Sequence, residues 1–404
     1  MKKRRLSILL SIVMLFSLLP TTALAASYPD AASVSVDGGK PFSLPGQLYY
    51  KNGNENGKFN GDKDDYNAWY DPDNGTLTLN GYSGGQIALG GAAQKDLTIK
   101  LIGNNTVTVN GYSGILVPAN GSNITITADS GSSGKLTINV TCDSDSGDAT
   151  GIDNYYGPGA SGDVTITGHA DVTINTTTKR GGYGIYAKNV AIEDHAKVAT
   201  TVNAPSNTGG GLICGIFAKN NVTINTAGEI MVDASNAGTG GYVYSTGVNS
   251  QNTLTLTKVG KMTVKWNDNL GSSGFPLYPT TASFDSDAYD TNETTVTNGD
   301  GTKYYIATYM PKVATANISL NKTGTVDFGN MEAGYPTAPE AQTVIITNNG
   351  TAATGALTIT LEGDNKTDFK LSTDAITDIP ASGTETFTVQ PNTELTAGTY
   401  NATV

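Results

Sequence analysis

One short pattern of apolar residues, repeated along the middle of the chain, limits the possible folds more than any other feature. Residues 184–204 read GIYAKNVAIEDHAKVATTVNA, and residues 215–234 read GIFAKNNVTINTAGEIMVDA. Both follow the spacing V-x-I-x5-V-x-V, which recurs in five copies and one looser copy. The copies are Ile99, Leu101, Val107 and Val109; Ile124, Ile126, Leu136 and Ile138 (looser); Val164, Ile166, Val172 and Ile174; Val190, Ile192, Val198 and Thr200; Val222, Ile224, Ile230 and Val232; Leu254, Leu256, Met262 and Val264.

Apolar residues at every second position predict short strands with one buried face, and the intervening Gly, Asn and Asp predict tight turns. One more strand precedes this pair in most copies and is therefore the first strand of the repeat. It lies at Gly114-Ile115, Gly151-Ile152, Gly184-Ile185, Gly215-Ile216 and Gly247-Val248. Three strands per repeat are typical of a parallel β-helix, because only stacked coils can bury such a face. We expect an all-β chain with a parallel β-helix of about six coils; a β-sandwich or a propeller is the alternative.

The repeat divides the chain into four parts. Residues 1–25 are expected to be a signal peptide, 26–80 an N-terminal cap with a hairpin at Asp73-Asn74-Gly75, and 81–310 the β-helix. In 311–404, strands at a spacing of about ten residues predict an immunoglobulin-like β-sandwich. Because the sequence stops within the last expected strand, this domain is expected to be truncated.

The N-terminus carries the signal for export. Four basic residues precede an apolar run and then Ala23-Leu24-Ala25, the order found in secretory signal peptides. Cleavage removes four of the 24 basic residues and none of the 36 acidic ones, which changes the formal net charge from −12 to −16. We expect a secreted or cell-surface protein that does not bind nucleic acid or insert in a membrane; any attachment to the cell wall would use a segment beyond residue 404.

Cysteine and histidine are rare. Cys142 and Cys214 fall at least two coils apart, which predicts free thiols. His169 and His195 each stand three residues before an expected strand, so stacked coils would place the two imidazoles about 4.8 Å apart. Two such rings could share a metal ion, but any repeat protein also stacks equivalent turn residues.

The Gly-Ile/Val and V-x-I-x5-V-x-V coils, with the lead-in WYD…GTLTLNGYSG, resemble secreted β-helix proteins of Gram-positive anaerobes. This resemblance covers roughly residues 49 to 310. It implies a right-handed, pectate-lyase-like helix that binds acidic plant polysaccharide with calcium. The remainder resembles immunoglobulin-like modules of bacterial surface proteins.

Pectin-active lyases and hydrolases share this architecture and are the enzymatic alternative. Lyases commonly use an arginine base beside a calcium cluster, and the hydrolases use clustered aspartates. Arg180 is the only arginine after the signal peptide and lies in the turn TTKRGGYG, and no adjacent Asp pair accompanies a Gly-His-Gly. We therefore expect a protein without enzyme activity.

One acidic segment, CDSDSGDATGID, is the candidate metal site. It places Asp143, Asp145, Asp148 and Asp153 around an expanded turn, and alternating carboxylates suit calcium. Gly147 falls one place early for a D-x-D-x-D-G loop and no glutamate closes it, so a solvated turn is the alternative. Calcium is the expected cofactor, because an acidic protein that binds an acidic polysaccharide needs a bridging cation.

Aromatic residues are the candidate ligand site. In GIYA and GIFA the inward Ile places Tyr186 and Phe217 on the outer face as an exposed ladder, with Tyr183, Tyr155 and Tyr156 close by in sequence. Aromatic faces stack on sugar rings; packing under a loop is the alternative. The expected function is non-catalytic polysaccharide binding. The alternatives are a pectin-active lyase or hydrolase, and a protein-recognising adhesin or structural stalk.

Overall fold

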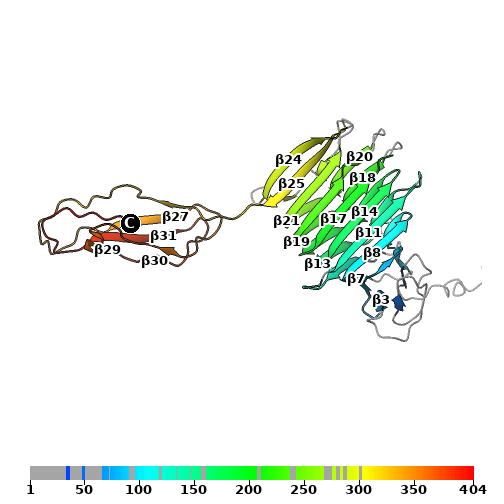
Figure 1. Cartoon of the computed structure of the whole chain (residues 1–404), viewed down its shortest axis with the longest axis horizontal. Helices are drawn as coiled ribbons and strands as arrows, with labels where there is room; N and C mark the ends of the chain where they lie inside the picture. The colour runs from blue at the N-terminus through cyan, green and yellow to red at the C-terminus, as the bar shows by residue number, and fades with distance from the viewer. Residues whose placement is uncertain are drawn as a thin grey trace, which may run out of the picture. The chain divides into compact units, whose positions relative to one another are not determined.

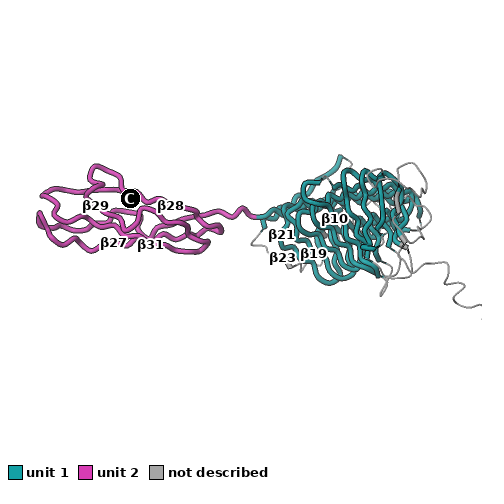
Figure 2. The backbone as a smooth tube through the Cα atoms, turned by 90° about the horizontal axis from the view of Figure 1, so that it is seen from below, with its two compact units in different colours: residues 1–311 teal, residues 312–404 magenta. Residues whose placement is uncertain are grey.

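The computed structural model is all-β, with long parallel sheets consistent with a β-helix-like fold (Figure 1). The residues that the structure describes are 33–36, 48–50, 66–71, 73–90, 96–117, 121–132, 134–145, 147–155, 161–206, 211–236, 243–267, 275–278, 283–284, 289–299 and 303–404. The expected signal peptide and Tyr156 lie outside them. The chain divides into two compact units, residues 1–311 and 312–404 (Figure 2).

The first strand of each repeat belongs to an eight-stranded sheet. Apart from β1, which pairs antiparallel with β6, its strands run parallel. In spatial order they are β1 (Ser33–Ser35), β6 (Ile87–Gly90), β9 (Ser113–Leu116), β12 (Ala149–Asn154), β15 (Gly182–Ala187), β18 (Gly211–Ala218), β20 (Val243–Ser250) and β22 (Phe275–Tyr278).

The second and third strands of the repeats form two parallel series within a 17-stranded sheet. One series is β4 (Thr76–Asn80), β7 (Leu97–Ile102), β10 (Ile124–Ala128), β13 (Val164–Gly168) and β16 (Val190–Asp194). The other is β5 (Ser83–Gly84), β8 (Asn104–Asn110), β11 (Lys135–Cys142), β14 (Asp171–Thr178) and β17 (Lys197–Asn203). The long strands β19 (Asn221–Ala234) and β21 (Thr253–Asn267) continue both series, and β23 (Ser283–Phe284) pairs with β21.

The repeated apolar residues form inward ladders along the stack. In the third strands, Ile138, Ile174, Thr200, Val232 and Val264 are paired in register and fully buried. The first copy of the pattern is placed two residues too late: Leu97 and Ile99, and not Ile99 and Leu101, pair with Ile124 and Ile126. A shift of two residues keeps every side chain on its own face, so the pattern could not detect it.

Glycine recurs inside the first strand of the repeat for a steric reason. A Cβ on Gly215 would collide with Cγ1 of Val232, and a Cβ on Gly247 with Cγ1 of Val264. The eight-stranded sheet therefore approaches the third strands too closely at this position for any larger residue.

A polar ladder also runs through the turn before the second strands. Side-chain amides donate from Asn123 to Asp96 Oδ2 (3.2 Å), from Asn189 to Asp163 Oδ1 (2.7 Å) and from Asn252 to Asn221 Oδ1 (3.0 Å). Backbone N–H groups complete it, from Asp163 to Asn123 Oδ1 (2.9 Å) and from Asn221 to Asn189 Oδ1 (3.1 Å). The turns are thus hydrogen-bonded from one layer to the next.

Antiparallel hairpins lie at both ends of this stack. At the N-terminal end, β3 (Ala68–Asp71) pairs with β2 (Leu48–Tyr50) and, through the expected turn at Asp73 to Gly75, with β4. At the other end, β25 (Lys303–Pro311) pairs with β21 and with β24 (Tyr289–Thr297). Such pairing occupies the sheet ends that would otherwise be open to another chain. Both cysteines are buried and free, as the coil spacing predicts.

The second unit contains two small antiparallel sheets around a core that includes Val344, Ile379 and Phe387. Its strands are β26 (Ile318–Leu320), β27 (Gln342–Asn348), β31 (Thr384–Pro391) and β29 (Phe369–Leu371) in one sheet, and β28 (Leu357–Thr358) and β30 (Ala375–Ile376) in the other; a 3-10 turn covers Lys366–Asp368. The segments GTVDFGNMEAG (324–334) and AGTYNATV (397–404) fit the expected strand spacing, but both are wrong as strands. Residues 324–334 form no strand, and Gly329 and Gly334 there have positive φ. Residues 397–404 contribute a single bridge, Thr403 to Glu362.

Candidate ligand-binding face

The candidate site lies on the eight-stranded sheet, on the side away from the core. Register places Asp153, Tyr186, Phe217, Asn249 and Tyr278 in one row across five neighbouring strands, β12 to β22. Ile185 and Ala187, on either side of Tyr186, are fully buried in the core. The alternation expected from GIYA and GIFA is therefore correct for Tyr186.

Four aromatic rings meet here and form what we call the aromatic cluster: Tyr155, Tyr183, Tyr186 and Phe217. The Tyr186 ring stacks on that of Tyr183, with centroids 4.6 Å apart and planes 17° apart. It also lies 4.8 Å from the Tyr155 ring, and the Phe217 ring meets it edge-on at 5.1 Å. The structure thus brings together every predicted ligand residue that it describes.

Phe217 differs from the expectation. Its side chain is only 4% exposed, so the predicted open ladder is wrong at this position. The Tyr183 and Tyr186 rings lie nearly perpendicular to it, with centroids 5.5 Å and 5.1 Å from its own, and the Lys219 ammonium lies 5.2 Å from its centroid. Phe217 is thus the buried member of the cluster, and the half-buried tyrosines form the accessible part.

Lys219 is the site residue that the sequence reasoning missed. Its Nζ lies over the Tyr155 ring as well, again 5.2 Å from the centroid, the range of a cation–π contact. No carboxylate in the described part of the chain pairs with it. The signal was present in the repeat, since AKN follows both GIY and GIF and so puts a lysine two residues after each outward aromatic residue.

Asp153 lies at the other end of the cluster. The Ser113 hydroxyl donates to its Oδ2 (3.1 Å) and the Tyr155 backbone N–H to its Oδ1 (3.4 Å). Burial raises the pKa of this carboxyl, and the two hydrogen bonds only partly oppose the rise. Asp153 therefore acts here as part of the sheet face, joined to the adjacent strand β9.

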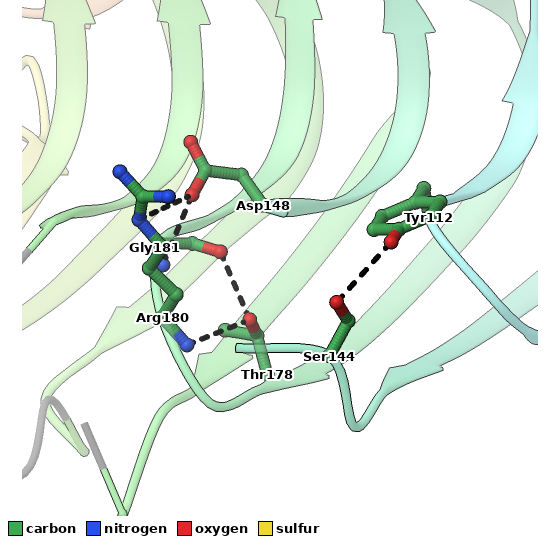
Figure 3. A network of polar contacts seen from close by, with 6 residues as sticks. All are labelled: Tyr112, Ser144, Asp148, Thr178, Arg180 and Gly181. Atoms are coloured by element: carbon green, nitrogen blue, oxygen red, sulfur yellow. Dashed lines mark hydrogen bonds and ion pairs between the residues drawn. The ribbon is translucent and has the colours of Figure 1, made fainter. Parts of the chain in front are cut away.

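Asp148 anchors the neighbouring turn (Figure 3). Its Oδ1 accepts from the Gly181 N–H at 3.2 Å and lies 4.0 Å from Nε of Arg180. Thr178 holds the same turn by donating to the Gly181 carbonyl (3.0 Å) and accepting from the Arg180 N–H (3.2 Å). Arg180, the candidate base of a lyase, is thus engaged in a turn contact.

The four candidate metal ligands occupy different surroundings. Asp143, Asp145 and Asp148 are exposed and Asp153 is half-buried, and Asp148 and Asp153 make the contacts above. Within the described ranges, no three His, Cys, Asp or Glu side chains gather closely enough to hold one ion. Calcium binding by these aspartates stays a prediction.

The hydroxyls of Tyr183 and Tyr186 are neutral at physiological pH. Burial raises the pKa of Tyr183, and the negative charge of Asp148 raises it further. Burial likewise raises the pKa of Tyr186, with Tyr155 and Asp153 adding to the effect. Protonated phenols beside flat rings can both donate and accept hydrogen bonds, which suits a hydroxyl-rich ligand.

Comparison of the chain with family models, curated proteins and solved structures finds no match in any of the three. Among the residues that the structure describes, no helix is long and apolar enough to cross a membrane.

Proposed function

We propose that the chain is an exported, non-catalytic carbohydrate-binding protein whose aromatic cluster contacts the sugar. The observation that carries this proposal is the stack of Tyr183 on Tyr186, with Tyr155 and the buried Phe217 beside it. Rings held by mutual contact lose little freedom when a sugar stacks on them, and the polar groups of Asp153 and Lys219 flank them.

The proposal includes finer features of the architecture. The parallel stack is proposed to be a right-handed, pectate-lyase-like helix of about six coils, and residues 312–404 an immunoglobulin-like spacer. The two-sheet arrangement and shared core of the second unit support the latter. The basic and apolar N-terminus supports export, to the medium or the cell surface.

Acidic polysaccharide remains the proposed ligand class, with two routes to its recognition. Calcium could bridge it to Asp143 and Asp145, which are exposed. Lys219 offers a direct route, since its ammonium lies at the cluster without a carboxylate partner among the described residues.

A binding assay on polygalacturonate, xylan and β-glucans, each with calcium and with a chelator, tests the proposal. We expect binding to at least one polymer, lost on Tyr186→Ala and retained on Tyr304→Ala. Tyr304 is a matched control, because it is a half-buried tyrosine on β25, away from both the aromatic cluster and the aspartates. Absence of binding to every polymer, or equal loss in both variants, contradicts the proposal, and release of an unsaturated product absorbing in the ultraviolet would establish a lyase instead.

A further inference from the structure

The only two histidines of the chain occupy equivalent turns of adjacent layers. His169 lies between β13 and β14, and His195 between β16 and β17. Their imidazole rings are stacked, with centroids 4.7 Å apart and planes within 8°. Both side chains are exposed, so neither imidazole is held in the apolar core.

The backbone fixes the two turns relative to each other. The His195 N–H donates to the Gly168 carbonyl at 3.0 Å, and the His169 N–H donates to the Ala128 carbonyl at 2.9 Å. The Cα positions are thus set by the same layer-to-layer bonding as the strands. Only the side-chain torsions remain free, so bringing both rings to one ion requires no backbone rearrangement.

A carboxylate accompanies the pair. Asp194 has a left-handed backbone (φ 59°), and its Oδ2 accepts from the Thr167 hydroxyl at 2.6 Å and the Gly168 N–H at 3.2 Å. The two hydrogen bonds fix the position of this carboxylate in the turn that carries His195, and a carboxylate next to two imidazoles favours a cation there.

We propose that His169 and His195 form a surface site for a transition-metal ion of the imidazole-preferring class, such as Zn(II), Ni(II) or Cu(II). Metal–nitrogen bonds of about 2.0–2.1 Å let two ligating nitrogens lie up to ~4 Å apart. Rotation of the two exposed rings about their side-chain torsions brings one nitrogen of each within that separation. Two protein ligands leave the remaining positions to water, in keeping with the absence of a three-ligand group in the described residues.

This site is independent of the aromatic cluster, which lies on the eight-stranded sheet, whereas the histidine turns connect strands of the 17-stranded sheet. It also differs in chemistry from the proposed calcium site, because neutral imidazole is a poor ligand for Ca²⁺ and a good one for Zn(II) and Cu(II). A failure to bind glycans would therefore not contradict the metal site, and a failure to bind Zn(II) would not contradict the proposed function.

Calorimetry with Zn(II) on the purified, tag-free chain tests the site, alongside His169→Gln, His195→Gln and the matched control Asn175→Gln. We expect one site on the wild-type protein and on the control, weakened about tenfold or more by either histidine substitution, because each removes half of a chelate. No Zn(II) binding to the wild-type protein, or affinity unchanged in either histidine variant, overturns the proposal.

Cu(II) electron paramagnetic resonance on the wild-type protein gives a readout that depends on no variant. Hyperfine structure from two equivalent nitrogens is the expected result at one equivalent of copper. A spectrum with one nitrogen, or with none, would mean that the imidazoles are stacked only as repeat residues and would overturn the proposal.

Discussion

The side chain of Asn189 donates a hydrogen bond to Asp163 over 2.7 Å and so joins one layer of the stack to the next. Its Oδ1 also accepts from the backbone N–H of Asn221 at 3.1 Å. One carboxamide therefore satisfies polar groups on both neighbouring layers, beside backbone bonds that join the same turns.

Asn189→Ala should lower the free energy of unfolding by about 1–3 kcal/mol, because it leaves the partly buried Asn221 N–H and the Asp163 carboxylate without this partner. Urea denaturation followed by circular dichroism measures the change. Asn175→Ala is the control: it removes one side-chain bond to Asn139 (2.9 Å) and leaves no backbone group unpaired. Equal midpoints for both variants would show that the polar ladder contributes nothing beyond an ordinary surface pair.

Thr200→Val should raise stability by about 1–3 kcal/mol, since its fully buried hydroxyl has no hydrogen-bond partner among the described residues and a valine would continue the ladder of Ile174 and Val232. Thr176→Val is the matched control, because that buried hydroxyl donates to the Tyr183 carbonyl at 3.2 Å. Urea midpoints should move upward for the first variant and not for the second. A destabilised Thr200→Val would mean that the hydroxyl is satisfied in solution.

Much of the stack could be predicted because its cause is local. Alternation gives the buried face of each strand, and Gly with Asn gives the turns, so the inward position of Ile174 or Val232 needs no knowledge of the rest. The register in which neighbouring strands pair could not be predicted in this way. Leu97 and Ile99 satisfy the same alternation as Ile99 and Leu101, and only pairing with β10 chooses between them.

The candidate site was predictable in its position but not in its exposure. The alternation of inward and outward residues places Tyr186 and Phe217 on the same face of the sheet. The Phe217 ring is nevertheless covered by the side chains of Tyr183, Tyr186 and Lys219, and the sequence of one strand does not predict that burial. The same limit applies to Asp148 and Asp153, which share a short segment of sequence but bond to different partners, the Gly181 N–H and the Ser113 hydroxyl. Proximity in sequence predicts a site only where the backbone also makes the side chains converge.

Asp153→Asn should stabilise the protein at pH 7 and lose this advantage on acidification. Burial raises the folded-state pKa of Asp153 above its ordinary 3.8, so the folded state retains a proton that the unfolded state releases as pH rises. The contribution of the Asp153 carboxyl to the free energy of unfolding is therefore fully present below pH 3.8, the ordinary pKa, and declines as pH rises through the folded-state pKa. Urea midpoints at pH 3, 5 and 7 measure the trend, with Asp374→Asn as the control, because Asp374 is exposed and belongs to no ion pair among the described residues. A variant advantage that is constant with pH would contradict this assignment.

Lys219→Met should weaken binding of a carboxylated glycan about fivefold, equivalent to ~1 kcal/mol, because it keeps the packing of the side chain and removes only the charge. Binding of a neutral glycan such as xylan should change little, since stacking on Tyr186 does not depend on the ammonium. Calorimetry on both ligands, in chelator so that calcium contributes nothing, separates the two effects. Lys197→Met, an exposed lysine on β17, serves as the control for the loss of one charge from a protein of net charge −12. If the acidic glycan binds only with calcium and equally well to the Lys219 variant, recognition runs through the bridging ion and the direct route is wrong.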